Sequence, residues 1–297
     1  MLMYLRRALC LLLAAVFALM PTYGLAVIPS YSESEETVLK SRESFTSVAE
    51  VNDRNLIYFA QNSPEWDAMR IDSTSKSFGK NYCSILALAN ALANCVPYEE
   101  LLDIGSLARL PFRVDSTHAD YEGGYEKSHK FIINRNCDIL RFLPLVIASI
   151  STGNNHSRYN DTMIASHYLS FFEAFGLDCS RTSSFDVCSD ALRKGAFVIT
   201  CTGGSDSPIA PKYGHYFVLA DIDDEYVYCL DSIYRDSYKD DKHHIIQLIQ
   251  PGVFRFAIED ARKMNLYGTK YIVYPKGDCP CYSPELLEQI IEESNEY

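Results

Sequence analysis

The feature that most constrains this chain is a cysteine, Cys83, at the start of a helical pattern. It follows a polar stretch that runs from Gln61 through Ser, Thr, Lys and Gly residues. Beyond Cys83, Ile, Leu and Ala residues recur at helical spacing until Pro97 excludes further helix. At the first turn of a helix, unpaired backbone N–H groups and the macrodipole favour the thiolate, the nucleophilic form of cysteine. The pattern predicts a reactive cysteine if the rest of the chain supplies a base.

A nucleophilic cysteine needs a general base, and the base needs an acceptor that orients it. Among the seven histidines, His215 alone opens a predicted strand, 215–221, and a second strand, 226–231, is predicted after an acidic turn. With residues 222–224 as the turn, His215 lies opposite Asp231, and such pairs share one face with Cβ atoms about 4.5–5.5 Å apart. A slip of one residue would change the partner. The hairpin predicts a Cys83–His215–Asp231 triad, and a hairpin with an ordinary polar end is the alternative.

Composition limits the partners of the protein. The chain has 39 acidic against 27 basic residues, a formal charge of −12, and no basic stripe. A nucleic-acid-binding surface needs clustered Lys and Arg, so that class of partner is not expected. Cys279-Pro-Cys281 is too small a motif for a zinc site. We expect a monomer with no metal and no other cofactor.

The first 26 residues predict a secretory signal. Arg6 and Arg7 precede an apolar run, 8–20, and Gly24-Leu25-Ala26 offers small residues for cleavage. The run is shorter than the roughly 20 residues of a membrane span. An uncleaved anchor is the alternative, and it would be the one contact with a membrane. We expect a secreted or cell-envelope-associated protein, whose remaining cysteines pair only if the compartment is oxidising.

The remaining chain predicts one α+β domain, because helical patterns come first and strand patterns later. An acidic, Ser- and Glu-rich arm, 27–54, precedes it, resembles a propeptide or linker, and is expected to be partly helical over 35–49. The main domain spans 55–276 with a loop-rich insertion near 111–160, and 277–297 forms a helical tail. The expected helices are 83–94, 98–110, 161–175 and 185–194, and the further strands are 55–60, 197–201 and 270–274.

Two stretches of the chain, 56–100 and 184–235, resemble the C-39-like cysteine peptidases of the papain superfamily. The first carries Gln61, Trp66 and then Cys83 opening a helix, and the second carries Gly214-His215-Tyr-Phe-Val-Leu and Val-Tyr-Cys-Leu-Asp231-Ser. The spacing of 132 residues from Cys83 to His215 is typical of the papain order, in which the cysteine comes early and the histidine about 130–150 residues later.

The resemblance implies a papain-like fold, in which the nucleophile helix packs on an antiparallel sheet, and cysteine peptidase activity on peptides or proteins. Cys83 would be the nucleophile, His215 the base and acid, and Asp231 its orienting acceptor, while Gln61 would donate to the oxyanion. The substrate-binding residues implied are Trp66, Tyr82 and Gly214. The chain departs from the family around the nucleophile, where Tyr82 replaces the usual glycine. A cell-wall peptide amidase and an inactive peptide-binding module on the same fold are the alternatives.

Overall fold

The protein is described by a computed structural model. It describes residues 47–52, 54–63, 69–71, 78–101, 118–121, 129–130, 143–144, 147, 167–210 and 214–277. All of them belong to the unit 31–297. The expected signal segment, Trp66, most of the insertion and the C-terminal tail lie outside these residues. No helix among the described residues is long and apolar enough to cross a membrane.

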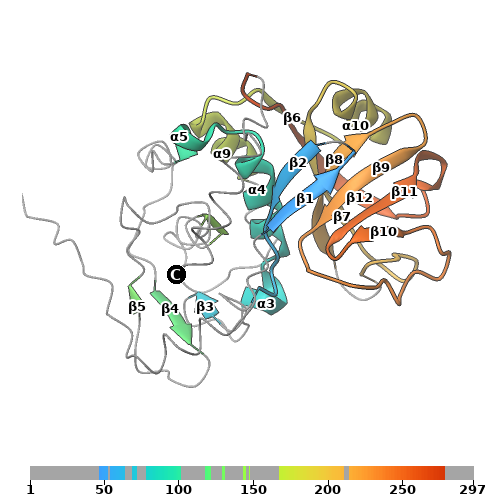
Figure 1. The fold of residues 1–297 in the computed structure, drawn as a ribbon, viewed down its shortest axis with the longest axis horizontal. Coiled ribbons are helices and arrows are strands. Elements are labelled where there is room, and N and C mark those ends of the chain that lie inside the picture. The colour runs from blue at the N-terminus through green and yellow to red at the C-terminus, as the bar shows by residue number, and fades with distance from the viewer. Residues whose placement is uncertain are drawn as a thin grey trace, which may run out of the picture. The chain divides into compact units, whose positions relative to one another are not determined.

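A seven-stranded antiparallel sheet dominates the described fold (Figure 1), which is therefore α+β, as predicted. Its strands are β6 (Cys179–Thr182), β7 (Phe197–Thr202), β8 (His215–Ile222), β9 (Tyr226–Asp231), β10 (Gln247–Gln250), β11 (Val253–Ala257) and β12 (Leu266–Val273). Their spatial order is β10-β11-β9-β8-β7-β12-β6. The strands expected at 197–201, 215–221 and 226–231 are confirmed within one residue at each end, whereas β12 begins four residues before the expected 270.

The described residues also form two smaller sheets, in which β2 (Arg54–Tyr58) confirms the strand expected at 55–60 and the other strands were not predicted. The strands β1 (Ser47–Val51) and β2 form an antiparallel hairpin, and Ala49 and Val51 are buried in the core. The helix expected over 35–49 is therefore wrong at its end, and residues 47–52 and 54 belong to the folded domain rather than to an arm. The strands β3 (Met69–Ile71), β4 (His118–Tyr121) and β5 (His129–Lys130) form the other sheet, partly inside the insertion expected to consist of loops.

The described helices are α3 (Phe78–Asn81), α4 (Cys83–Ala93), α5 (Tyr98–Leu101), α9 (Tyr168–Ala174) and α10 (Phe185–Leu192), with the 3-10 turn η1 (Ile258–Asp260). Of these, α4, α9 and α10 pack on the seven-stranded sheet. Helix α4 begins at Cys83, as predicted. The Ser184 hydroxyl caps α10 by accepting the N–H of Val187 at 3.4 Å, which also confirms a predicted start.

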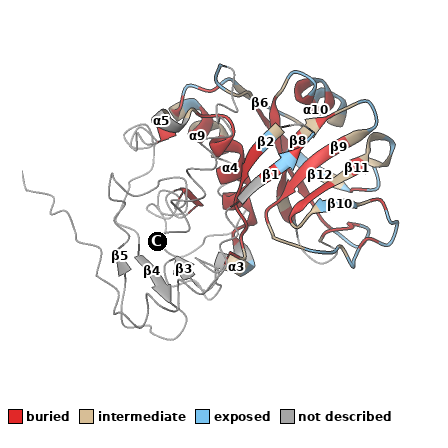
Figure 2. Cartoon of the chain, in the orientation of Figure 1, coloured by how far each residue is buried: buried red, intermediate tan, exposed pale blue. Residues whose placement is uncertain are grey.

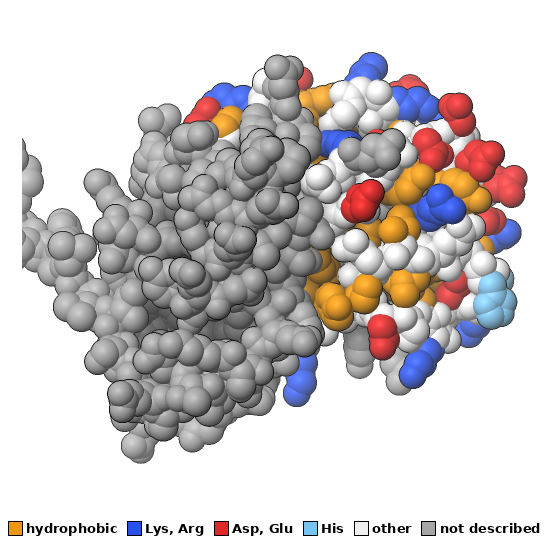
Figure 3. All heavy atoms as spheres, viewed as in Figure 1, with side chains coloured by type: hydrophobic (Ala, Val, Ile, Leu, Met, Phe, Trp, Pro, Cys, Tyr) orange, Lys and Arg blue, Asp and Glu red, His pale blue; other side chains and the backbone are white. Residues whose placement is uncertain are grey.

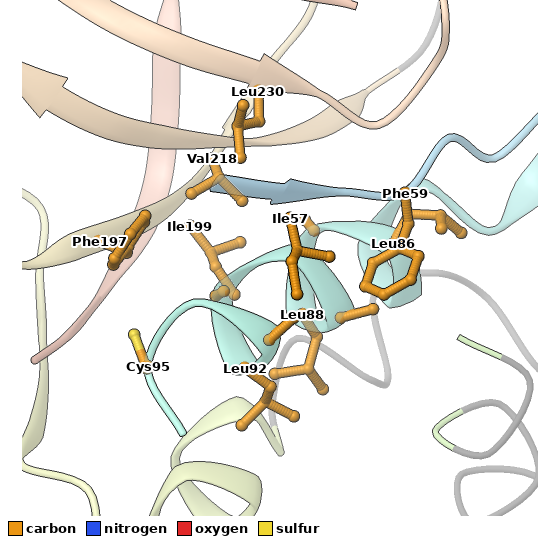
Figure 4. Packing of buried hydrophobic residues seen from close by; sticks show 14 of the residues in the cluster. Ile57, Phe59, Leu86, Leu88, Leu92, Cys95, Phe197, Ile199, Val218 and Leu230 are labelled. Carbon is orange, nitrogen blue, oxygen red and sulfur yellow. The ribbon is translucent and has the colours of Figure 1, made fainter. Parts of the chain in front are cut away.

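Both faces of the seven-stranded sheet are buried, and the side chains of β8 point alternately into two hydrophobic cores. Val218 and Ala220 face the core that contains α4, whereas Phe217 and Leu219 face the core that contains α10. Every residue of α4 is buried, consistent with its almost continuous apolar sequence (Figure 2). In Figure 4, Ile57, Ile199 and Val218 lie on the sheet side of α4, whereas Leu88 and Leu92 point away from the sheet, and all five belong to one core.

The visible surface of the described part carries mixed charges. In Figure 3, lysine and arginine side chains lie among acidic and apolar ones and form no continuous basic stripe on that face of the described residues.

Two buried asparagines attach α4 to strand β2. The Asn94 side chain accepts the N–H of Ile57 and donates to its carbonyl, both at 2.8 Å. One helical turn earlier, the Asn90 side chain accepts the N–H of Phe59 at 2.7 Å and donates to its carbonyl at 3.1 Å. Because a buried backbone group without a partner is costly, these amides satisfy four groups that would otherwise destabilise the core.

We predict that Asn90→Ala lowers the free energy of unfolding by about 2–4 kcal/mol, because it leaves the N–H and carbonyl of Phe59 buried without partners. Chemical denaturation with a spectroscopic readout measures the loss. The matched control is Asn55→Ala, at an exposed position of β2, which is expected to change stability by less than about 0.5 kcal/mol. Equal losses in the two variants would contradict the role of the buried amide.

Candidate active site

His215 and Asp231 lie in contact at one end of the sheet. The Nε2 atom of His215 is 2.5 Å from Oδ1 of Asp231, and the two side chains are 5% and 0% exposed. The register that predicted this contact is wrong, since Asp231 lies opposite Phe217 rather than His215. The hairpin continues to Ile222 before it turns, and a bulge lies between Leu219 and Asp221. The net offset is two residues, which keeps both side chains on one face, so the contact forms diagonally.

The carboxylate of Asp231 has further partners on both oxygens. Oδ1 accepts the N–H of Ile233 at 3.0 Å, while Oδ2 accepts the Tyr238 hydroxyl at 3.1 Å and is 3.1 Å from Nε of Arg235. Burial alone would raise the pKa of Asp231, but the charges of His215 and Arg235, with the hydrogen bonds, outweigh it and lower that pKa. Asp231 is therefore a buried carboxylate that stays ionised at neutral pH.

Ser232, the residue after Asp231, joins three segments of the site. Its hydroxyl is 2.9 Å from the carbonyl oxygen of Cys83 and 2.7 Å from that of Tyr216, the neighbour of His215. Its own carbonyl accepts the N–H of Gln61 at 2.7 Å. The start of α4, the start of β8, the end of β9 and the Gln61 loop therefore meet at one residue, Ser232.

Gln61 is 2% exposed, and its amide is oriented by α3. Its Nε2 donates to the carbonyl of Gly79 at 2.9 Å, which leaves one amide hydrogen available, because a primary amide carries two. Its Oε1 is buried and has no hydrogen-bond partner among the described residues. The site thus holds a donor group whose orientation is set by a single backbone contact.

Cys83 is the first residue of α4 and is 5% exposed. Tyr82, which precedes it, has the same exposed fraction and packs in the core, so its expected role in substrate binding stays a prediction. The expected substrate residue Gly214 is exposed, and a Cβ there would collide with the hydroxyl of Tyr267. Burial, followed by the neighbouring thiols of Cys201 and Cys83, raises the pKa of Tyr267 to about 12.

Of the residues expected at the site, His215 and Asp231 have side chains in direct contact. Cys83, His215, Asp231 and Gln61 lie on segments joined through Ser232. Trp66 lies outside the described residues.

Four residues that the sequence did not single out contribute to the site: Ser232, Arg235, Tyr238 and Tyr267. Ser232 could have been found from its place next to Asp231. Arg235 and Tyr238 come from an irregular loop, and Tyr267 precedes the expected strand, so no pattern marked them.

The described cysteines are thiols rather than disulfides. They are Cys83, Cys95, Cys179, Cys188, Cys201 and Cys229.

Comparison with known proteins gives no family for this chain. No protein-family model matches it, and no curated protein matches it.

We predict that Asp231→Asn lowers the free energy of unfolding at pH 7 by about 2–4 kcal/mol, because it removes the buried negative charge that faces His215 and Arg235. The pKa of Asp231 is lower in the folded protein than the unfolded value of about 3.9. Its contribution is therefore complete above about pH 4 and is lost as the pH falls through the folded pKa.

Urea unfolding between pH 7 and pH 3 measures this dependence, and the difference between wild type and Asp231→Asn should shrink toward the acid end. Asp190→Asn on α10, where the side chain is 75% exposed, is the matched control and should have little effect at any pH. A difference for Asp231→Asn that is constant over this range would show that its charge is not what stabilises the fold.

Proposed function

We propose that this chain is an exported, papain-like thiol hydrolase, a cysteine peptidase that cleaves peptide bonds through Cys83, His215 and Asp231. The observation that carries the proposal is the buried His215–Asp231 pair, attached through the Ser232 hydroxyl to the carbonyl of Cys83. An imidazole oriented by a carboxylate next to a cysteine at a helix start is what nucleophilic thiol catalysis needs.

The contact with Asp231 selects the tautomer of His215. Because the carboxylate is ionised, Nε2 carries the hydrogen of that hydrogen bond, and the lone pair stands on Nδ1. Nδ1 is therefore the atom that takes the proton from the Cys83 thiol. Asp231 then stabilises the imidazolium that results.

The reaction follows from these roles. The Cys83 thiolate attacks the carbonyl carbon of the peptide, and the negative charge that develops on the carbonyl oxygen is stabilised by the amide of Gln61 and the backbone N–H of Cys83. The imidazolium of His215 gives its proton to the leaving amine, and a thioester remains on Cys83. Water, deprotonated by His215, then attacks the thioester and releases the acid and the free enzyme.

The proposal makes one geometric demand. Side chains alternate between the two faces of the sheet along β8, so His215 lies on the same face as Phe217, whereas α4 packs on the opposite face, that of Val218. The ring of His215 must therefore reach Cys83 around the end of β8, where His215 is the first residue and Tyr216 shares the hydroxyl of Ser232 with Cys83.

Several other thiols are poor competitors in this protein. Burial raises the pKa of Cys95 and Cys229 well above the ordinary range, and it raises that of Cys188 to about 11. Because the thiolate is the reacting form, we expect a thiol-directed electrophile at neutral pH to react at Cys83 before it reacts at these three thiols.

We predict that an epoxysuccinyl peptide labels the wild-type protein at Cys83, as read by peptide mass spectrometry, and that Cys83→Ala abolishes both labelling and peptide hydrolysis. His215→Ala should lower the rate of labelling and hydrolysis by at least about 10²-fold, because the base is lost. Cys188→Ala, which removes a buried thiol on α10, is the control and should retain both activities. Full hydrolysis by Cys83→Ala would overturn the mechanism.

The same assay separates the alternatives. Hydrolysis of stem peptides from peptidoglycan without hydrolysis of protein substrates would indicate a cell-wall amidase. Binding of peptides without labelling or turnover would indicate an inactive binding module.

We predict that Gln61→Ala slows turnover by about 10²–10³-fold and leaves the rate of Cys83 labelling within a few-fold of wild type. The reason is that Gln61 acts on the oxyanion, whereas alkylation of the thiolate forms none. Steady-state kinetics and labelling rates on the same preparation measure the two effects. The comparison variant is Asn62→Ala, which removes contacts to the backbone of Tyr234 but no oxyanion donor. Unaltered turnover in Gln61→Ala would reject the role of this amide.

A further inference from the structure

The outer oxygen of Asp231, Oδ2, faces away from the contact with His215 and has its own charged partner. Nε of Arg235 is 3.1 Å from Oδ2, and the side chain of Arg235 is 23% exposed. The guanidinium is also held by the carbonyl of Ile209, 3.3 Å from Nη1, and it lies over the ring of Tyr238 at 5.9 Å from the centroid. A fixed cation therefore stands behind the carboxylate.

The main chain fixes this cation relative to Asp231 as well. The backbone carbonyl of Arg235 accepts the N–H of Gly252, and the carbonyl of Gly252 accepts the N–H of Asp231, at 2.9 and 2.8 Å. Gly252 has a φ of 78°, and a Cβ there would collide with the side chain of Tyr58. The loop after β9 and the turn before β11 thus support the same ion pair.

We propose that Arg235 is a positioning residue that holds Asp231 toward His215 and, through its charge, sets the pH range in which Cys83 and His215 work as a pair. This inference rests on the proposed function. It assigns no contact with substrate to Arg235, which acts through Asp231.

The charges around Asp231 make the effect specific. The titratable groups that face it are His215 from β8, Cys229 from β9, Tyr58 from β2, and Tyr238 and Arg235 from the loop after β9. Burial, reinforced by the Asp231 charge, raises the pKa of Cys229, Tyr58 and Tyr238, so these three stay neutral at neutral pH. Arg235 is then the one permanent cation facing Asp231 among the described residues.

A positive charge at this place has a defined sign. It offsets part of the negative charge that the Asp231 carboxylate presents to its other partners, and its removal would favour the protonated forms of acids nearby. Because the ion pair is largely buried, solvent and salt screen it weakly. Without Arg235, Asp231 would act on His215 with its full negative charge.

The test is Arg235→Gln in the full-length protein. The acid limb of the pH profile of Cys83 alkylation reports proton loss from the thiol, and the alkaline limb reports proton loss from the imidazolium. Both limbs should move to higher pH by about half a unit or more. The imidazole of His215, followed by NMR in protein labelled with ¹⁵N-histidine and assigned by its absence in His215→Asn, should show the same upward shift.

Two variants serve as controls. Arg235→Lys keeps the charge and should leave both limbs near their wild-type positions. Arg193→Gln makes the same substitution on α10, where the guanidinium lies 3.9 Å from Asp190 and is 49% exposed, and should also leave them unchanged. If Arg235→Gln does not fold, Arg235→Met removes the charge and keeps the stem that packs on Tyr238.

Failure of this inference differs from failure of the proposed function. A stable Arg235→Gln with lower activity, unmoved limbs and an unmoved His215 titration would make Arg235 a structural residue and overturn the inference, as would loss of folding in both charge-free variants. A wild-type protein that hydrolyses no peptide while the His215 titration still shifts would overturn the proposed function and leave the electrostatic role of Arg235 in place.

Discussion

The Ser232 hydroxyl is the contact on which the geometry of the site depends. It lies within hydrogen-bond distance of the carbonyls of Cys83 and Tyr216, and the Ser232 backbone receives the N–H of Gln61. Cys83 and His215 are far apart in the sequence and sit on opposite faces of a buried sheet, so side-chain packing alone would let them shift relative to each other. A short polar side chain next to Asp231 gives the helix and the strand a common reference point, which is how precise sites are built on rigid elements.

This arrangement places a negative charge in the protein interior. Asp231 is fully buried, and an isolated carboxylate there would be protonated rather than ionised. The fold avoids that outcome by placing hydrogen-bond donors and a cation around the carboxylate: an imidazole, a backbone N–H and a phenol form hydrogen bonds, and a guanidinium forms an ion pair. The same groups that stabilise the charge also fix its direction, so stability and orientation of the site have one physical origin.

Local patterns predicted the elements that carry the site, and tertiary structure decided the rest. The start of α4 at Cys83 follows from apolar spacing that any helix requires. The contact between His215 and Asp231 was predicted with the wrong strand pairing, because a bulge in β8 leaves no mark in the sequence. The two side chains are in contact nonetheless, since an offset of two residues keeps both on the same face of the sheet. Tyr267 was missed because β12 is interrupted at Gly268, whose φ of 70° accompanies a shift of register. Strand β1 was missed because its Ser- and Glu-containing sequence resembles a solvated arm, although Ala49 and Val51 are buried.

Asn90 and Asn94 have an effect beyond the stability of the core. A two-stranded sheet has two open edges, and an open edge of hydrogen-bonding groups is a template for pairing with another chain. At Ile57 and Phe59 the backbone groups that face away from β1 are already bound by the two amides of α4. The helix therefore takes the position of a third strand, and intermolecular β-pairing is blocked on that side of β2 by side chains that imitate a backbone.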